Sequence, residues 1–219
     1  MIPEASAEFV CAMEEVLEVY CRPYDKDYPV VCFDESPKQL VSEVRESYID
    51  NQGVKHEDCE YKREGSAEIF MMAEPFGERR EVFVEENHTG ITWADSVAYI
   101  VEEMYADAKK VTLVEDNLSS RKNHNLYKVF EPARARAIMD RLELVYTPKH
   151  DSWLNIAECE LSVLSRQALN NRFESKGALE KQVKKWAFDR NNAQKGVIWQ
   201  FKTADARIKL KKLYPTVLT

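Results

Sequence analysis

Two aspartates each follow a short apolar run that is typical of a buried strand. Asp34 comes directly after residues 30–33 (VVCF), and Asp116 comes after residues 111–115 (VTLVE). A buried, unpaired carboxylate costs several kcal/mol or takes up a proton, so a positive partner is expected. Open α/β sheets bind ligands at the carboxyl ends of their strands, and a hard divalent cation such as Mg²⁺ is the simplest partner there. The commoner alternative is that such acids begin solvated loops or cap the next helix.

A third carboxylate comes from a predicted helix that begins at Asp151 or Ser152. The apolar residues of this segment recur at helical spacing and form one face, on which we expect Trp153 to pack in the core. Glu158 lies at one rim of that face, from which it can reach a cleft at the sheet edge. Glu160 lies at the other rim, so helix geometry alone does not choose between the two glutamates.

The strands and helices that must position these acids follow from apolar periodicity and turn residues. We predict strands at residues 29–35, 111–117 and 142–148, and two or three antiparallel strands within 60–87, with turns near Gly65 and residues 75–77. We predict helices at residues 5–20, 92–108 with Thr92 as its cap, 126–142, a long one from Ser152, and 203–213 with Thr203 as its cap. This order of elements indicates one α/β domain.

The cysteine pattern and the hydropathy of the chain bear on the cellular compartment of the protein. The five cysteines form no CxxC pair and are odd in number, which argues against a disulfide framework or a zinc ribbon. The amino terminus lacks the pattern of a signal peptide, and no apolar run approaches the roughly 20 residues that span a bilayer. We therefore predict a cytoplasmic protein without a membrane partner.

The charge is distributed unevenly along the chain. The net charge is −7, but residues 1–118 hold 11 Lys and Arg against 28 Asp and Glu, while residues 119–219 hold 20 against 10. A basic half suits the phosphate backbone of a nucleic acid. Two solvated faces that differ in sign explain the same charge distribution equally well.

Five segments of the chain carry a family resemblance. They are CFDESPKQL (32–40), EYKREGSAEIF (60–70), LVEDNLSS (113–120), YTPKHDSWLNIAECELSVLSRQ (146–167) and WQFKTADARIKLKKLYP (199–215). Together they resemble the catalytic part of bacterial insertion-sequence transposases of the mariner superfamily, the IS six-thirty family. The resemblance implies an RNase H-like α/β fold, with a mixed five-stranded sheet and helices on both faces.

The resemblance also assigns roles to the acids. It implies a DDE triad of Asp34, Asp116 and Glu158, in which the three residues are both catalytic and metal ligands for two ions of Mg²⁺ or Mn²⁺. Glu35, Glu115 and Glu160 are then neighbours of the triad. The implied partners are double-stranded DNA, as element ends and as target, and a second copy of the chain in a homodimer. Further DNA contacts are predicted for Arg121, Lys149, His150, Asn155, Arg207, Lys209 and Lys212.

The chain departs from the family pattern at two positions near the triad. Family members usually read Asp-Asn-Leu-Asn-Thr-His from the second aspartate, whereas this chain ends the same run with Arg121. They usually have glycine where Asp151 stands. We expect residues 1–28 to form an amino-terminal helix and linker and residues 29–219 to form the catalytic domain, with no helix-turn-helix module.

Three functions remain open from the sequence. The resemblance favours metal-dependent DNA strand cleavage and strand transfer. The altered motif and the expected absence of a DNA-binding module favour a catalytically impaired, truncated remnant that binds DNA or a full-length transposase as an inhibitor. An RNase H-fold nuclease without transposition is the third alternative, and the family-specific segments disfavour it.

Overall fold

The computed structural model describes residues 5–44, 48–56, 60–77, 79–148, 152–194, 196–197 and 199–216. The strands within this part are β1 (Val30–Glu43), β2 (Tyr48–Ile49), β3 (Lys55–His56), β4 (Tyr61–Glu74), β5 (Arg79–Glu85), β6 (Val111–Glu115) and β7 (Leu142–Tyr146). The α-helices are α1 (Ala7–Val19), α2 (Gly90–Tyr99), α3 (Leu126–Val129), α4 (Pro132–Asp140), α5 (Ile156–Ala168), α6 (Lys176–Asn192) and α7 (Thr203–Lys209). The π-helical turn is η1 (Ile100–Met104), and the 3-10 helical turns are η2 (Asn123–Asn125), η3 (Ser152–Leu154) and η4 (Lys211–Leu213).

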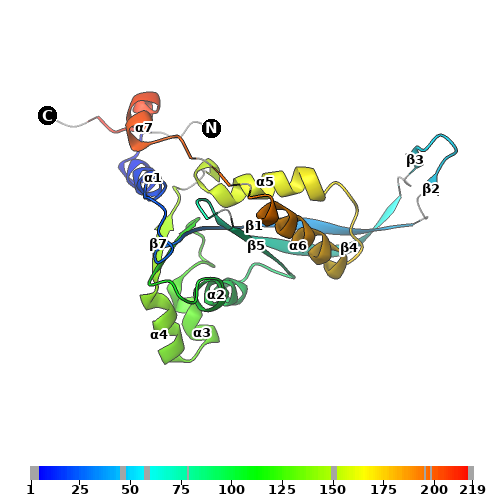
Figure 1. Ribbon diagram of the computed structural model, residues 1–219, viewed down its shortest axis with the longest axis horizontal. Helices are drawn as coiled ribbons and strands as arrows, with labels where there is room; N and C mark the ends of the chain where they lie inside the picture. Colours follow the sequence, from blue (N-terminus) through cyan, green and yellow to red (C-terminus); the bar gives the residue numbers. More distant parts are fainter. Residues whose placement is uncertain are drawn as a thin grey trace.

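The main sheet has five strands in the order β5-β4-β1-β6-β7. The β1–β4 and β4–β5 pairs are antiparallel, while β1–β6 and β6–β7 are parallel. The predicted mixed five-stranded sheet is therefore confirmed. In this topology β1 lies at the centre and joins the antiparallel half to the parallel half (Figure 1).

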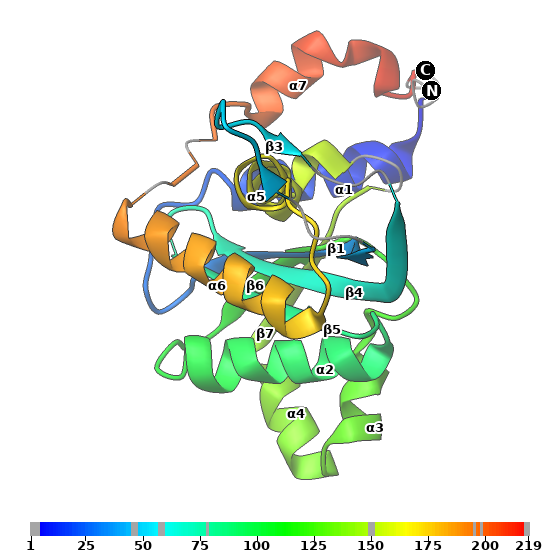
Figure 2. The ribbon, with the colours of Figure 1, turned by 90° about the vertical axis from the view of Figure 1, so that its right-hand side faces the viewer.

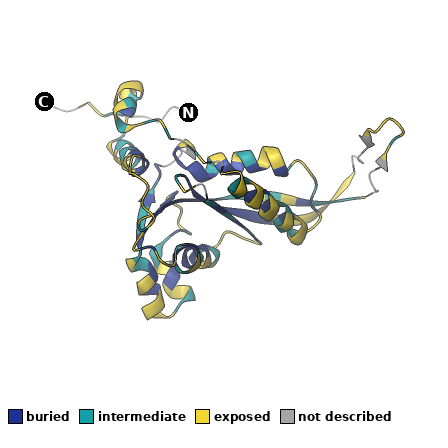
Figure 3. Ribbon diagram, in the orientation of Figure 1, coloured by how far each residue is buried: buried dark blue, intermediate teal, exposed yellow. Residues whose placement is uncertain are grey.

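Helices cover both faces of the sheet, as predicted (Figure 2). Because side chains alternate along a strand, Cys32 of β1 packs into a core with α1, α5 and α6, while Phe33 packs into a second core with α2, α3 and α4. Figure 3 shows the buried residues gathered on the sheet and on the sides of the helices that face it. The two cores fix β1 from both sides, which holds the residue after Phe33 in a defined position.

The strands β1 and β4 continue well beyond the helices as a long two-stranded ribbon, with β2 and β3 near its far end (Figure 1). The predicted turn near Gly65 is wrong, because β4 runs through this residue. Gly65 has φ +113° and lies where the β1–β4 register shifts between Leu40 and Val41, so it marks a β-bulge. The predicted turn at residues 75–77 is confirmed.

Several helix boundaries differ from the prediction. Thr89, not Thr92, caps α2, since its hydroxyl accepts from the Thr92 backbone N–H. The predicted helix over 126–142 is two helices, because α4 starts afresh at Pro132, where the proline ring favours the first helical position. The helix α6 was missed because its few buried apolar residues stand among many charged ones.

Within the described residues, no helix combines the length and the apolar character needed to cross a bilayer. Cys11, Cys21, Cys32 and Cys159 are free thiols.

Candidate active site

The parallel pairing of β1 with β6 brings the two predicted aspartates level. The register pairs Cys32 with Val114; Asp34 lies two residues further along β1, and Asp116 follows directly after the end of β6 at Glu115. Residues two apart in a strand point to the same face, so the Asp34 carboxylate lies on the side of Cys32. The predicted end of the first strand at residue 35 is wrong, because β1 pairs with β4 as far as Glu43, but Asp34 lies where its parallel partner β6 ends and is thereby close to Asp116.

Arg121 joins the two aspartates. Its Nη2 donates to Asp34 Oδ1 at 3.0 Å and also contacts Glu35, and its Nη1 lies 2.5 Å from Asp116 Oδ1. Since the contacts come from the two terminal nitrogens of one planar guanidinium, the aspartate oxygens lie within about 8 Å of each other. Arg121 is only 1% exposed, although the sequence analysis predicted that it would contact DNA.

A tight turn after β6 directs Arg121 inward. Its backbone N–H donates to the Leu118 carbonyl at 3.1 Å, which reverses the chain directly after Asp116. The guanidinium carbon of Arg121 lies 5.4 Å from the centre of the Phe33 ring, so a cation–π contact stabilises the charge. Strand and turn together therefore seat a buried positive charge beside the acids.

The acids outnumber the cation, and burial affects their protonation. Burial raises the pKa of Glu35 and of Asp116, and the charge of Arg121 opposes the shift in both cases. Burial alone lowers the pKa of Arg121, but the charges of Glu35, Asp34 and Asp116 outweigh it and raise the pKa. Three carboxyl groups thus surround one guanidinium, and burial favours the protonated form of Glu35 and Asp116.

Glu115 belongs to the opposite face of the sheet. It is fully buried, and its Oε2 accepts from the Trp93 indole N–H at 2.8 Å. Burial raises the pKa of Glu115 to about 8, against the opposing effect of the Trp93 hydrogen bond. Glu115 is thus held by α2 rather than by the aspartate pair.

Asn155 fixes the second oxygen of Asp34. Its side-chain N–H₂ donates to the Phe33 carbonyl at 3.0 Å and to Asp34 Oδ2 at 3.3 Å. Its carbonyl oxygen accepts from the Ala157 backbone N–H at 3.1 Å, which makes Asn155 the cap of α5. The predicted helix start at Asp151 or Ser152 is therefore wrong. Asn155 is 1% exposed and faces Asp34, so its predicted DNA contact stays untested.

Loss of Asn155 is expected to affect both the fold and Asp34. Asn155→Ala removes a helix cap, which costs about 1 kcal/mol, and frees the Asp34 carboxylate to rotate. The control is Ser175→Ala, which removes the equivalent cap of α6. Urea denaturation should show a larger loss for Asn155→Ala, which also removes buried hydrogen bonds to Phe33 and Asp34, and only this variant should lower metal-dependent DNA nicking, by about tenfold or more. Equal nicking by the two variants would contradict the positioning role.

Glu158 occupies the third position of α5 and is partly exposed. Together with Asp34, Glu35 and Ser36 it lines a pocket of about 350 Å³, closed on the helix side by Leu161, Ser162 and Ser165. The pocket therefore brings one carboxylate of α5 to the same space as Asp34.

Glu160 lies on the other side of α5, as predicted from its place at the opposite rim of the apolar face, and it is buried there. It is 2% exposed and accepts from Arg80 at 2.8 and 3.0 Å and from Arg190 at 3.0 Å. These partners come from β5 and α6, on the far side of α5 from Asp34. Glu160 is thus a structural ion-pair residue, while Glu158 is the glutamate that shares a pocket with Asp34.

The family follows from the match of a sequence model. The model of the DDE superfamily endonucleases matches residues 29–180, which is more than half of the chain and contains Asp34, Asp116 and Glu158. The chain belongs to the DDE superfamily endonucleases. No curated protein sequence matches it significantly.

Solved structures of a transposase share the DDE endonuclease fold of this chain. The Mos1 transposase paired-end complex with left transposon end matches with a TM-score of 0.56 and 13% identity, over 88% of this chain and 59% of that chain. The Mos1 strand transfer complex matches with a TM-score of 0.55 and 13% identity, over 89% and 61% of the two chains. A mariner Mos1 paired-end complex with Mg gives a TM-score of 0.55 and 13% identity, over 99% and 66%. The RNase H-like fold is thereby confirmed, and this chain spans about 60% of the first two Mos1 chains.

The donor atoms of this DDE site suit a hard divalent cation. Carboxylate oxygens are the ligands that Mg²⁺ and Mn²⁺ prefer. Asp116 Oδ1 is buried and, although it forms an ion pair with Arg121, it has no hydrogen-bond partner among the described residues. Arg121 nevertheless lies between Asp34 and Asp116, and no three Asp, Glu, His or Cys side chains of the described part converge as a preformed metal site. The acids thus fit the metal chemically, and the guanidinium occupies the space between two of them.

The remaining predicted DNA contacts lie at the carboxyl-terminal end of the chain or outside the described residues. Arg207, Lys209 and Lys212 are exposed in α7 and η4. Arg207 pairs with Glu14 of α1 at 2.7 Å, which ties α7 to α1. Lys149 and His150 lie outside the described residues. A DNA contact by any of these residues stays a prediction.

Trp153 does not pack in the core as predicted. It lies in η3, before α5 begins, and is 39% exposed. Its ring stacks on Trp199 with the ring centres 6.3 Å apart and makes an edge contact with Phe201. The early helix start in the prediction caused this error, because it placed Trp153 on the apolar face of α5.

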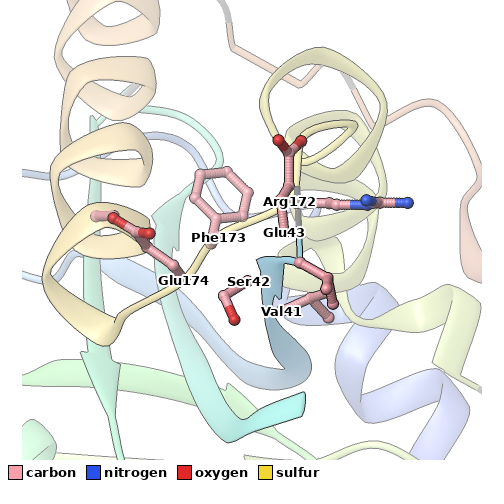
Figure 4. A pocket seen from close by; sticks show the side chains of 8 residues that line it. Val41, Ser42, Glu43, Arg172, Phe173 and Glu174 are labelled. Atoms are coloured by element: carbon pink, nitrogen blue, oxygen red, sulfur yellow. The ribbon is translucent and has the colours of Figure 1, made fainter. Parts of the chain in front are cut away.

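A second pocket lies near the base of the long ribbon and does not include the triad (Figure 4). It has a volume of about 420 Å³ and is lined by residues 41–44 at the carboxyl end of β1 and just beyond it, and by the α5–α6 connection, including Arg172 and Phe173. At about 3.3 Å per strand residue, it lies roughly 20 Å from Asp34. This second pocket is thus separate from the one that Asp34 and Glu158 share.

Proposed function

We propose that this chain is the catalytic domain of a DDE transposase that cleaves DNA strands and transfers them to a target in a metal-dependent reaction. The observation that carries the proposal is the placement of Asp34 of β1 beside Asp116, which follows the end of the parallel strand β6, with Glu158 of α5 on a pocket shared with Asp34. The family match over residues 29–180 supports the assignment. Within that family we infer the bacterial insertion-sequence type of the mariner superfamily, the IS six-thirty family, from the five sequence segments.

The chain's own residues prepare the site for this chemistry. Asp34 is held at both oxygens, by Arg121 and by Asn155, so its lone pairs are oriented before a ligand arrives. Asp116 and Glu158 approach from a different strand and from α5, which places carboxylates on two sides of one space. Divalent ions held there would activate water and stabilise the leaving 3′ oxygen of a phosphodiester.

The wider organisation is also part of the proposal. We assign residues 29–219 to the catalytic domain and residues 1–28 to an amino-terminal helix and linker. The proposed partner is double-stranded DNA, since one similar Mos1 structure is a paired-end complex with left transposon end, and the proposal includes a homodimer. A cytoplasmic location stays a prediction from the sequence. Nothing in the comparisons favours the alternative of an inhibitory remnant.

Nicking of supercoiled plasmid DNA tests the proposal. The chain should convert supercoiled DNA to the open circular form when Mg²⁺ or Mn²⁺ is present, and chelation should stop the reaction. Joining of a labelled 3′-hydroxyl DNA end to the plasmid would demonstrate strand transfer. If neither nicking nor joining occurs with either ion, although circular dichroism shows a folded chain, the proposal is wrong.

A further inference from the structure

The guanidinium of Arg121 lies at a position between the triad aspartates at which a bound cation would be expected. The guanidinium contacts Asp34, Glu35 and Asp116 at once, and it is 1% exposed. A planar fork that meets several carboxylates is the arrangement for which arginine is suited. The positive charge therefore sits where Asp34 and Asp116 would otherwise share an ion.

The space on the other side of Asp34 has a different character. The pocket of about 350 Å³ between Asp34 and Glu158 is lined by three acidic residues, which include Glu35, by three serines and by Leu161. The side chain of Arg121 does not line this pocket. The guanidinium thus occupies the space between Asp34 and Asp116, while the space between Asp34 and Glu158 is a pocket with oxygen ligands.

We propose that Arg121 takes the place of one of the two cations of the DDE site, so that this chain binds a single divalent ion between Asp34 and Glu158. The inference rests on the proposed function, because it assumes that these acids hold metal. It replaces the two ions expected from the sequence by one ion and one guanidinium.

The surroundings of Arg121 make its displacement by metal unfavourable. The guanidinium is enclosed by the Phe33 ring below it and by the tight turn after β6. Removing it from three carboxylates would leave a buried charge without solvent or partners. A metal ion would also be repelled by the guanidinium if both occupied the space between Asp34 and Asp116.

Mn²⁺ binding measures the stoichiometry directly, by the loss of the free-ion electron paramagnetic resonance signal during titration. The wild-type chain should bind one Mn²⁺. Arg121→Gln removes the charge and leaves Asp34 and Asp116 free to share an ion, so this variant should bind two. Glu158→Gln should remove the single ion of the wild-type chain.

The matched control is Arg80→Gln, which removes another buried arginine from an ion pair outside the triad. It should bind one Mn²⁺, as the wild-type chain does. Two ions in the wild-type chain, one ion in Arg121→Gln, or a second ion in Arg80→Gln would each overturn the inference and leave the proposed function standing. No Mn²⁺ binding by any variant would overturn the metal role in the proposed function as well. If Arg121→Gln does not fold, the wild-type and Glu158→Gln titrations decide between one ion and two.

Discussion

Glu158→Gln is expected to abolish metal-dependent DNA nicking, with a loss of more than about 100-fold, because even the partners of metal ligands contribute 10- to 100-fold. The amide keeps the shape of the side chain but loses the charge that attracts a hard cation to the pocket shared with Asp34. The fold should remain intact, since Glu158 is partly exposed at the start of α5. Plasmid nicking and a melting curve on the same preparation measure the two effects separately.

The control for this variant is Glu180→Gln, which removes the same charge from α6. Glu180 forms an exposed ion pair with Lys184, so its loss should change the nicking rate by less than about twofold. The assignment of Glu158 fails if Glu158→Gln nicks DNA as fast as Glu180→Gln.

Glu160→Gln is expected to destabilise the fold by about 3–5 kcal/mol, because it leaves buried Arg80 and the partly buried Arg190 without their shared carboxylate. For a chain of this size, such a loss lowers the melting temperature by roughly 10 °C. Urea denaturation gives the free energy of unfolding. Any loss of nicking by Glu160→Gln should follow the unfolded fraction, so nicking should return at a temperature at which the variant is folded.

An exposed ion pair on α6 provides the comparison. Asp189→Asn breaks the Lys185–Asp189 pair at the surface, which should cost less than about 1 kcal/mol. Should Glu160→Gln lose no more stability than Asp189→Asn, the buried ion pair would not hold α5 to β5 and α6.

The sequence predicted two central strands of the sheet, and the proximity of Asp34 and Asp116, because short apolar runs of neighbouring residues indicate these strands. Asp34 and Asp116 follow apolar runs that form strands wherever they are buried on both faces, and the parallel pairing of β1 with β6 then places the acids together. The start of α5 was misplaced because Ser152 and Asn155 are both good caps, and only the contact of Asn155 with Asp34 decides between them.

Partners that are distant in sequence could not be predicted in the same way. Glu160 and Arg80 are 80 residues apart, so their pairing depends on the packing of α5 against β5. Arg121 was visible as a departure from the family motif, but the sequence did not show whether it faces DNA or the triad. The turn that starts at Leu118 decides this, by directing the side chain toward Asp34.

A switch of metal preference tests the central claim, that Asp34 is a direct metal ligand at the catalytic site. Asp34→Cys replaces a hard oxygen by a soft sulfur, which binds Mg²⁺ poorly and accepts the softer Mn²⁺ more readily. We predict that the wild-type chain nicks plasmid DNA with either ion, whereas Asp34→Cys is inactive with Mg²⁺ and regains measurable nicking with Mn²⁺. Nicking by Asp34→Cys at the wild-type rate with Mg²⁺ would contradict the account.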